Sequence, residues 1–240
     1  MNALPSPNIR GSCVDSSTPT DHVGRGGATP TLPLFFRLGE KDDAAQCVIK
    51  HHYSGVFPPP GTIVCVGTAH EAGGLFGDVG RCVAAVVFCH PPARWSVRIV
   101  DLLRVVKVPD VFFPLSSLIG WTVRQLKKQG HHLAVSYADK SHNHHGGLYQ
   151  ACGWKYGGMR DPKVDGYVID GEYVACRTLN HRYGTHSKNK LKEQHGIEAT
   201  PNMDQGKHIY YLPLSKQGEA FAEQVNLTPH PYPKPKEGQP

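Results

Sequence analysis

Apolar and polar positions in the middle of the chain follow two alternating patterns. Runs of β-branched and other apolar residues predict strands, whereas apolar residues three and four positions apart predict helices. Strands are expected at 32–38, 62–68, 81–89, 97–108, 132–137 and 208–212, and helices at 42–52, 114–129 and 143–152. This order predicts an α/β (α+β) domain with a central mixed sheet flanked by helices.

Turn signals and the two ends of the chain set the limits of this domain. Asp170-Gly171 lies between apolar runs at 167–169 and 173–179, which is typical of a two-residue β-hairpin. Residues 1–31 are rich in Pro, Ser, Thr and Gly, and we expect a disordered leader there. We expect the folded domain at 32–213, followed by a Pro-rich, mobile tail at 214–240.

The charge balance points towards an anionic partner. There are 26 Lys and Arg residues against 20 Asp and Glu, a net charge of +6, and nucleic acid is the first candidate. Many soluble enzymes carry a similar charge, which is the alternative. The stretch 182–192 has four basic residues and no acid, and either contacts a phosphate backbone or is an ordinary basic helix face. Its candidate DNA-binding residues are Arg182, Lys188, Lys190 and Lys192.

Cysteine usage and hydropathy exclude several protein classes. The seven cysteines include no CxxC pair, and most lie in apolar runs, so we expect buried free thiols and neither a disulfide framework nor a zinc finger. No apolar run reaches the length of a membrane span, and no secretory signal is visible. We therefore expect a cytosolic protein without a membrane partner.

The densest set of chemically active side chains lies in Ser136–Gly158. This segment leaves a predicted strand and enters a polar turn, and strand ends in α/β sheets are where ligands bind. It carries Asp139, His142, His144, His145 and Tyr149. Asp139 is either a cap or a functional carboxylate, and Tyr149 is either core or functional.

A second group of candidates ends the first predicted helix. His52 and Tyr53 either complete a helix C-terminus or point towards the mouth of the sheet. One imidazole and one carboxylate, completed by phenolic oxygens or water, would suit Fe(II), Mn(II) or Zn(II). We expect Trp154 and Tyr156 to be core residues rather than a base-stacking platform.

The predicted element order resembles the GNAT acyltransferase fold, in which a gap between the fourth and fifth strands holds an acyl-coenzyme A. The glycine-rich turn that cradles pyrophosphate in those enzymes should fall at 108–117. That stretch reads VPDVFFPLSS and contains no glycine. An acyl-coenzyme A-like donor is therefore expected from the fold but not from this turn.

Three motifs resemble the Mom proteins of transposable bacteriophages: HHYSG at 51–55, LLRVVKVP at 102–109 and SYADKSHNHHGGLYQACGWKYGG at 136–158. The resemblance implies a GNAT-like catalytic domain in the host bacterial cytoplasm. It implies conversion of adenine in double-stranded DNA to N6-carbamoylmethyladenine, which protects phage DNA from restriction. It also implies bound iron. The residues carried over as both catalytic and metal-binding are His52, Tyr53, Asp139 and Tyr149, with Arg104 as cofactor-binding.

Two alternatives stay open beside this hypothesis. One is a conventional GNAT-type acyltransferase acting on a small amine or a protein. The other is a non-catalytic, metal-containing DNA-binding protein.

Overall fold

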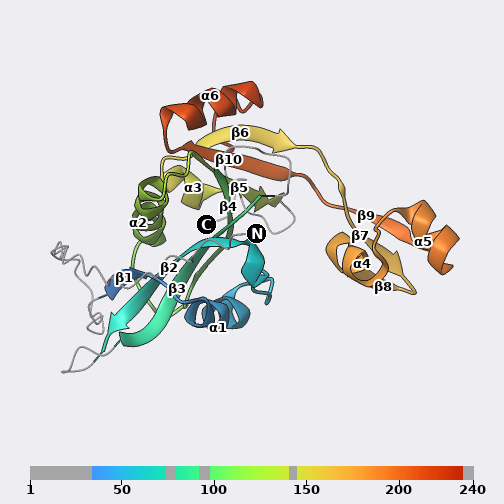
Figure 1. Ribbon diagram of the computed structural model, residues 1–240, viewed down its shortest axis with the longest axis horizontal. Coiled ribbons are helices and arrows are strands. Elements are labelled where there is room, and N and C mark those ends of the chain that lie inside the picture. Colours follow the sequence, from blue (N-terminus) through green and yellow to red (C-terminus); the bar gives the residue numbers. More distant parts are fainter. Residues whose placement is uncertain (1–33, 74–78, 92–97, 141–144, 235–240) are drawn as a thin grey trace, which may run out of the picture. The chain divides into compact units, whose positions relative to one another are not determined.

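The computed structural model describes residues 34–73, 79–91, 98–140 and 145–234. Its main sheet has seven strands and can be followed in Figure 1. The strand order is β1-β2-β3-β4-β5-β10-β6, and all neighbours are antiparallel except β4 and β5. The strands are β1 (Leu34–Leu38), β2 (Ile63–Ala72), β3 (Val79–Cys89), β4 (Ile99–Lys107), β5 (Leu133–Asp139), β6 (Lys155–Arg160) and β10 (Lys207–Pro213).

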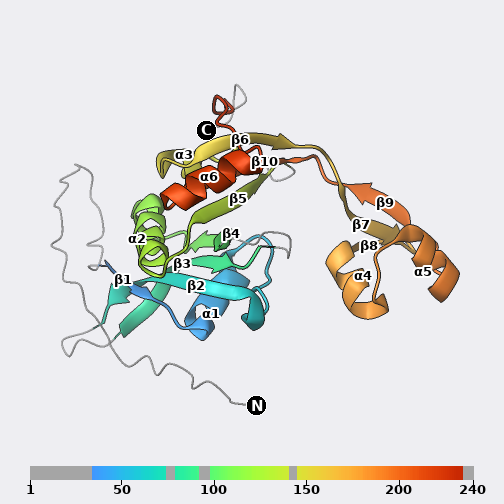
Figure 2. The ribbon, with the colours of Figure 1, turned by 45° about the horizontal axis from the view of Figure 1, so that its top comes forward.

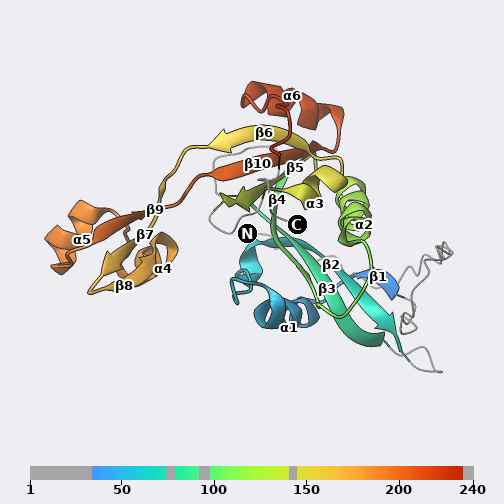
Figure 3. The same ribbon diagram turned by 180° about the vertical axis from the view of Figure 1, so that it is seen from behind.

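Two helices cover opposite faces of this sheet, as Figures 2 and 3 show: α1 (Lys41–His51) and α2 (Leu115–Lys128). Gly67 on β2 faces α2, because a Cβ there would lie 2.0 Å from the Thr122 hydroxyl. The opposite face of β2 carries buried His70, which accepts a hydrogen bond from Arg37 Nε at 3.1 Å. Both faces are therefore covered, which explains why the strands read as continuous apolar runs. Three shorter elements complete this part of the protein: a 3₁₀ helix at Pro60–Thr62, α3 (Gly147–Ala151) and α6 (Lys216–Gln224).

The parallel pair β4–β5 separates partway along its length. Ile99–Asp101 pairs with Leu133–Val135, and no register pair follows between the later residues of these two strands. The separation begins between Leu102 and Ser136, so the interior of the sheet opens there. The predicted GNAT-like fold class, with its gap between the fourth and fifth strands, is confirmed by this order and pairing.

Residues between β6 and β10 form a three-stranded sheet with its own core, which we call the insert (residues 161–206). It contains β7 (Val164–Ile169), β8 (Glu172–Ala175), α4 (Cys176–Tyr183), α5 (Lys188–His195) and β9 (Thr200–Met203). Its buried core is formed by Tyr167, Leu179, Leu191 and Ala199. The predicted Asp170-Gly171 turn is confirmed, with φ values of 51° and 83°.

Several elements differ from the sequence-based expectation. The strand predicted at 173–179 ends at Ala175 and continues as α4, because Leu179 packs into the insert core at helical spacing with Tyr183. The helix predicted at 143–152 is Gly147–Ala151 in the described part of the chain. Strand β9 was not expected, whereas α5 matches the basic helix that was one of the two alternatives for 182–192.

The C-terminal segment also differs from the expected tail at 214–240. Helix α6 occupies its first part and packs Phe221 and Ala222 against the core residue Tyr211. Beyond it, the Tyr232 hydroxyl donates to the Trp154 carbonyl at 2.8 Å. Apolar positions within a charged sequence (KQGEAFAEQ) explain why composition alone missed this helix. The predicted leader at 1–31 lies outside the described residues.

The described cysteines and two aromatic residues bear on the expectations about the core. The six described cysteines are free thiols, of which Cys47, Cys65 and Cys89 are buried. Trp154 and Tyr156 are core residues, 0% and 8% exposed. Among the described helices, none has the length and apolar character needed to cross a membrane.

Candidate active site

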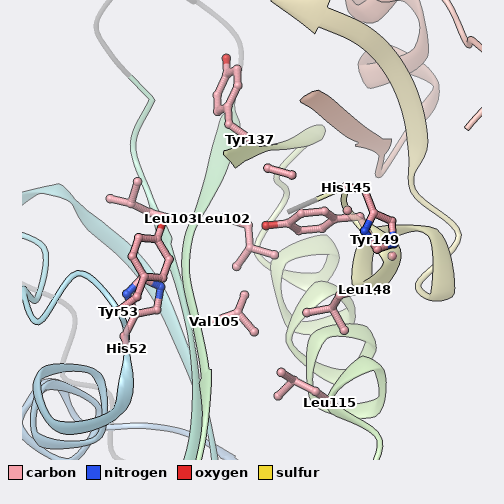
Figure 4. Close-up of a pocket in the computed structure, with 13 residues that line it drawn as sticks. His52, Tyr53, Leu102, Leu103, Val105, Leu115, Tyr137, His145, Leu148 and Tyr149 are labelled. Atoms are coloured by element: carbon pink, nitrogen blue, oxygen red, sulfur yellow. The ribbon is translucent and has the colours of Figure 1, made fainter. Parts of the chain in front are cut away.

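A cavity of about 350 Å³ lies where β4 and β5 separate (Figure 4). That volume is within the range of small-molecule sites. Side chains from five parts of the chain line it: the end of α1, β4, the start of α2, β5, and the segment from His145 into α3. The polar and aromatic ones are His52, Tyr53, Tyr137, His145 and Tyr149. In Figure 4, His52 and Tyr53 lie on one side of β4, and His145 and Tyr149 on the other.

The Tyr149 phenol is held by a hydroxyl at the point of strand separation. Ser136 is fully buried, and its Oγ lies 2.8 Å from the Tyr149 hydroxyl and 2.8 Å from the Leu102 carbonyl oxygen. A carbonyl only accepts hydrogen bonds, and a serine hydroxyl has one proton. Ser136 therefore donates to Leu102, and Tyr149 donates to Ser136. The phenol keeps its oxygen lone pairs for the cavity.

Burial keeps Tyr149 protonated. Desolvation raises the pKa of Tyr149 to about 12. The nearby Asp101 carboxylate and Tyr53 add smaller increases. At neutral pH, Tyr149 is thus a neutral phenol, which suits it to hydrogen bonding and not to acting as a base.

Aromatic packing fixes the Tyr149 ring. Its centroid lies 5.1 Å from the stacked ring of Tyr210 and 5.5 Å from Trp154. The Tyr210 hydroxyl donates to the His145 carbonyl oxygen at 2.6 Å. Gly146 has φ +80°, and a Cβ there would lie 2.2 Å from the Tyr210 ring. Glycine is therefore required beside the ring that supports Tyr149.

His52 has a defined arrangement of its ring nitrogens. The Ser54 backbone N–H donates to His52 Nδ1 at 3.1 Å, and the Ser54 hydroxyl lies 2.8 Å from the same atom. Because a backbone N–H only donates, Nδ1 accepts, and the neutral ring carries its proton on Nε2. His52 then offers a donor rather than a lone pair at Nε2. Its ring packs on Tyr53 with centroids 4.3 Å apart.

Arg104, predicted to bind the cofactor, fastens the segment that carries these two residues. Its Nε donates to the Val56 carbonyl at 3.1 Å, and Nη1 donates to the Leu103 carbonyl at 2.9 Å. Arg104 is not among the residues that line the cavity. In this structure, its guanidinium ties the chain after α1 to β4.

Asp139 stands apart from the other three predicted site residues. His52, Tyr53 and Tyr149 line one cavity, but Asp139 does not. Its carboxylate pairs with Lys207 Nζ at 3.0 Å, across the register of β5 and β10. It follows the lining residues Tyr137 and Ala138 directly, so it lies next to the rim.

The described side chains do not fit the predicted iron site. No group of three or more His, Cys, Asp and Glu side chains able to hold a metal occurs among the described residues. Within the predicted ligand set, Asp139 is outside the cavity, and His52 uses Nδ1 as an acceptor while Nε2 carries the proton. His142 and His144 lie outside the described residues.

The predicted DNA-binding residues fall in the insert, outside the cavity. Arg182 lies in the last turn of α4, and Lys188, Lys190 and Lys192 lie on α5; all four are exposed. Lys192 Nζ pairs with Glu198 at 2.6 Å, and both side chains remain largely exposed. Such exposed pairs contribute little stability.

Sequence reasoning missed three residues around Tyr149: Ser136, Asp101 and Tyr137. Burial raises the pKa of Tyr137, and Asp101 adds to this effect. A signal for Asp101 was present, because it is an acid inside the apolar strand segment IVDLLRVV. Ser136 was not recognisable, since only the fold brings it to the phenol of Tyr149.

Comparisons with known proteins found solved structures and one protein family. Solved structures with a similar arrangement include the spermidine N-acetyltransferase SpeG K23-Y30 chimera from Vibrio cholerae and hSSAT, at 12% identity, TM-score 0.46 and coverage of 76% of this chain and 97% of that chain. The putative acetyltransferase yncA from Salmonella typhimurium, solved with acetyl-CoA, has 14% identity, TM-score 0.45 and coverage of 76% and 95%. The ribosomal-protein-S18-alanine N-acetyltransferase from Escherichia coli has 12% identity, TM-score 0.44 and the same coverage.

Each of these TM-scores is below 0.5, so the fold assignment stands on the strand order and pairing described above. The search of curated proteins gave no match. The Mom protein family model matches residues 34–234, which include the whole cavity and the insert. The chain belongs to the Mom protein family.

Proposed function

We propose that this protein is a DNA-modifying transferase that converts adenine in double-stranded DNA to N6-carbamoylmethyladenine. The observation that carries the proposal is the cavity at the β4–β5 separation, which brings His52, Tyr53 and Tyr149 together in a member of the Mom family. Modification would take place in the host bacterial cytoplasm and would shield phage DNA from restriction.

The cavity suits a base taken out of the duplex. The adenine N6 amine is paired inside double-stranded DNA, so the enzyme must extrude the nucleotide to reach it. Tyr53 is 60% exposed beside His52, and a phenol ring at the cavity edge can stack on a base. We assign Tyr53 to holding the extruded adenine.

The remaining cavity side chains have complementary hydrogen-bonding capacities. Tyr149 offers oxygen lone pairs to the N6 amine, because its proton is directed to Ser136. His52 offers Nε2–H to charge that develops on the donor. His145 supplies an imidazole that can take the N6 proton. In the transfer, N6 bonds to the methylene carbon of the carbamoylmethyl group, the bond from that carbon to its leaving group breaks with its electron pair going to the leaving group, and N6 loses one proton to His145.

An acyl-coenzyme A-like donor would enter between β4 and β5 with its methylene carbon, and not its thioester carbonyl, facing N6, because attack on the carbonyl would give an N6-acyl adenine. The pairing of β4 with β3 skips Leu103, which places a bulge at the cavity wall. The segment before α2 lacks glycine, and Leu115 at the start of α2 lines the cavity. We therefore place the reactive end of the donor at the bulge. The proposal assigns no pyrophosphate-binding role to the segment before α2.

Mass spectrometry of nucleosides tests this function. DNA from cells that express the chain should contain N6-carbamoylmethyladenine, and DNA from cells with the empty vector should not. If DNA is unmodified and the purified protein acetylates a small amine or a protein from acetyl-coenzyme A, the conventional acyltransferase is correct instead. DNA retention without any modified nucleoside would favour the non-catalytic binding protein.

A further inference from the structure

The helices α4 and α5 of the insert are arranged like a pair of helices in which the second one binds the DNA major groove. α4 (Cys176–Tyr183) and α5 (Lys188–His195) are joined by four residues, 184–187. The connection starts with Gly184 at φ +69°. Two helices joined by a three- or four-residue turn, often with glycine, are the layout in which the second helix enters the DNA major groove.

Side-chain contacts hold these two helices in place. Leu179 and Leu191 are both 0% exposed in the insert core, one from each helix. The Tyr183 and His195 rings are 5.0 Å apart at their centroids. Within the connection, His186 Nδ1 lies 3.0 Å from Asn180 Oδ1. The unit is therefore packed rather than loosely attached, as a reading element must be.

Charge is unevenly distributed over the insert. Residues 176–195 carry five basic residues and one acid, Glu193. Residues 161–175, which include the β7–β8 hairpin, carry four acids and one lysine. A polyanion would be attracted by the helices and repelled by the hairpin, so this distribution selects the helical side of the insert for DNA.

The positions on α5 follow from its single buried residue. Successive residues of a helix are rotated by about 100°. Asn189 and Glu193 therefore lie about 160° from Leu191, on the crest that faces away from the core. Lys190 and Lys192 lie about 100° from Leu191, one on each side of that crest. All four are exposed.

This arrangement matches the chemistry of a major groove. An amide on the crest can make two hydrogen bonds to N6 and N7 of adenine, whereas flanking ammonium groups reach the phosphates of the two strands. Lys192 would exchange its exposed partner Glu198 for a phosphate. We infer that α5 docks in the major groove of double-stranded DNA and that Asn189 reads a base edge beside the modified nucleotide. This inference deepens the proposed function, on which it rests for its substrate.

The experiment compares the full-length protein with three variants on a library of duplexes that contain a randomised segment. Bound DNA is separated and sequenced, and the affinity for the preferred sequence is measured by fluorescence anisotropy at several salt concentrations. The variants are Asn189→Ala, Lys190→Ala and Gln217→Ala, the last being an exposed amide on α6, outside the insert.

Asn189→Ala should weaken binding to the preferred sequence by roughly 5- to 150-fold, flatten the sequence preference and leave the salt slope unchanged. Lys190→Ala should weaken binding to all sequences and reduce the salt slope by about 1. Gln217→Ala should match the unmodified protein. The inference is overturned if Asn189→Ala keeps the original preference, or if the unmodified protein shows none.

Nucleoside analysis separates this result from the proposed function. If cells contain modified adenine but the Asn189→Ala variant keeps the original sequence preference, the proposed function is supported and the role of α5 is wrong. If the sequence preference depends on Asn189 but no modified adenine is found, the role of α5 in DNA recognition is supported and the proposed function is wrong.

Discussion

The Ser136 hydroxyl oxygen lies 2.8 Å from the Tyr149 phenol oxygen, in the gap where β4 and β5 stop pairing. This contact joins the backbone of β4, through the Leu102 carbonyl, to a cavity side chain on α3. It sets the direction of the Tyr149 proton, and the proposed chemistry depends on that direction.

Ser136→Ala should remove the hydrogen bond that directs the Tyr149 proton. Tyr149 would lose its acceptor, and the Leu102 carbonyl would lose its donor, at a cost of about 1–3 kcal/mol in the free energy of unfolding. We expect at least a tenfold fall in modified adenine, measured by nucleoside mass spectrometry. The matched control is Thr122→Val, which removes a buried hydroxyl that donates to the Leu118 carbonyl at 2.8 Å within α2. An equal loss of activity in both variants would mean that stability, and not the phenol proton, limits the reaction.

Alkaline pH should destabilise the protein partly through Tyr149. The folded pKa of Tyr149 is raised from 10 to about 12, so its stabilising contribution is complete below pH 10 and disappears as pH rises from about 10 to 12. Urea unfolding at pH 8 and pH 11 measures this loss. Tyr149→Phe should lose less stability between the two values than the unmodified protein; the same loss in both would show that Tyr149 does not titrate in this way.

Arg104→Lys should loosen the segment that carries His52 and Tyr53. Lysine lacks the planar guanidinium that donates from Nε to the Val56 carbonyl and from Nη1 to the Leu103 carbonyl at the same time. We expect about a tenfold loss of modification, with less than about 1.5 kcal/mol lost in unfolding free energy. Arg98→Lys serves as the control, because Arg98 donates to the Gln129 carbonyl at the end of α2. A similar activity for both variants would contradict the anchoring role.

Asp139→Asn tests a residue at the cavity rim. Its ion pair with Lys207 is partly exposed, so losing it should cost less than about 1 kcal/mol. We expect modification to fall at least tenfold, because the family resemblance places this carboxylate in the reaction. Lys207→Met breaks the same pair and should keep activity. Equal effects of the two variants would assign Asp139 to the ion pair alone.

Iron stays a prediction from the family resemblance. The described core is closed by apolar packing around Leu118, Val86 and Trp154, so folding does not depend on metal ligation there. Dialysis against a chelator should therefore leave the melting temperature unchanged within about 2 °C. A large fall in the melting temperature, together with iron detected by elemental analysis, would show a structural metal that the described residues do not reveal.

The strands of the seven-stranded sheet and the helices that cover it were largely predictable from the sequence. Each shows either a continuous apolar run or apolar residues at helical spacing. β3 is continuously apolar from Cys82 to Cys89, and α2 carries Leu118, Ile119, Val123 and Leu126 at helical spacing. The insert was harder to predict, since α5 has a single buried residue among charged neighbours and no periodicity to detect. In the cavity, His52, Tyr53 and Tyr149 were found because they are chemically conspicuous. Ser136 gains its role only from long-range packing.

The most direct test of the central claim compares Tyr149→Phe with Tyr156→Phe in cells, by the amount of N6-carbamoylmethyladenine per adenine. Both substitutions remove one phenol hydroxyl. Tyr149 lines the cavity, whereas the Tyr156 hydroxyl lies 2.9 Å from His208 Nδ1 and lines no part of it. The account predicts that Tyr149→Phe lowers modification at least a hundredfold and that Tyr156→Phe keeps most of it. Full modification by Tyr149→Phe, or no modified adenine with the unaltered chain, would contradict it.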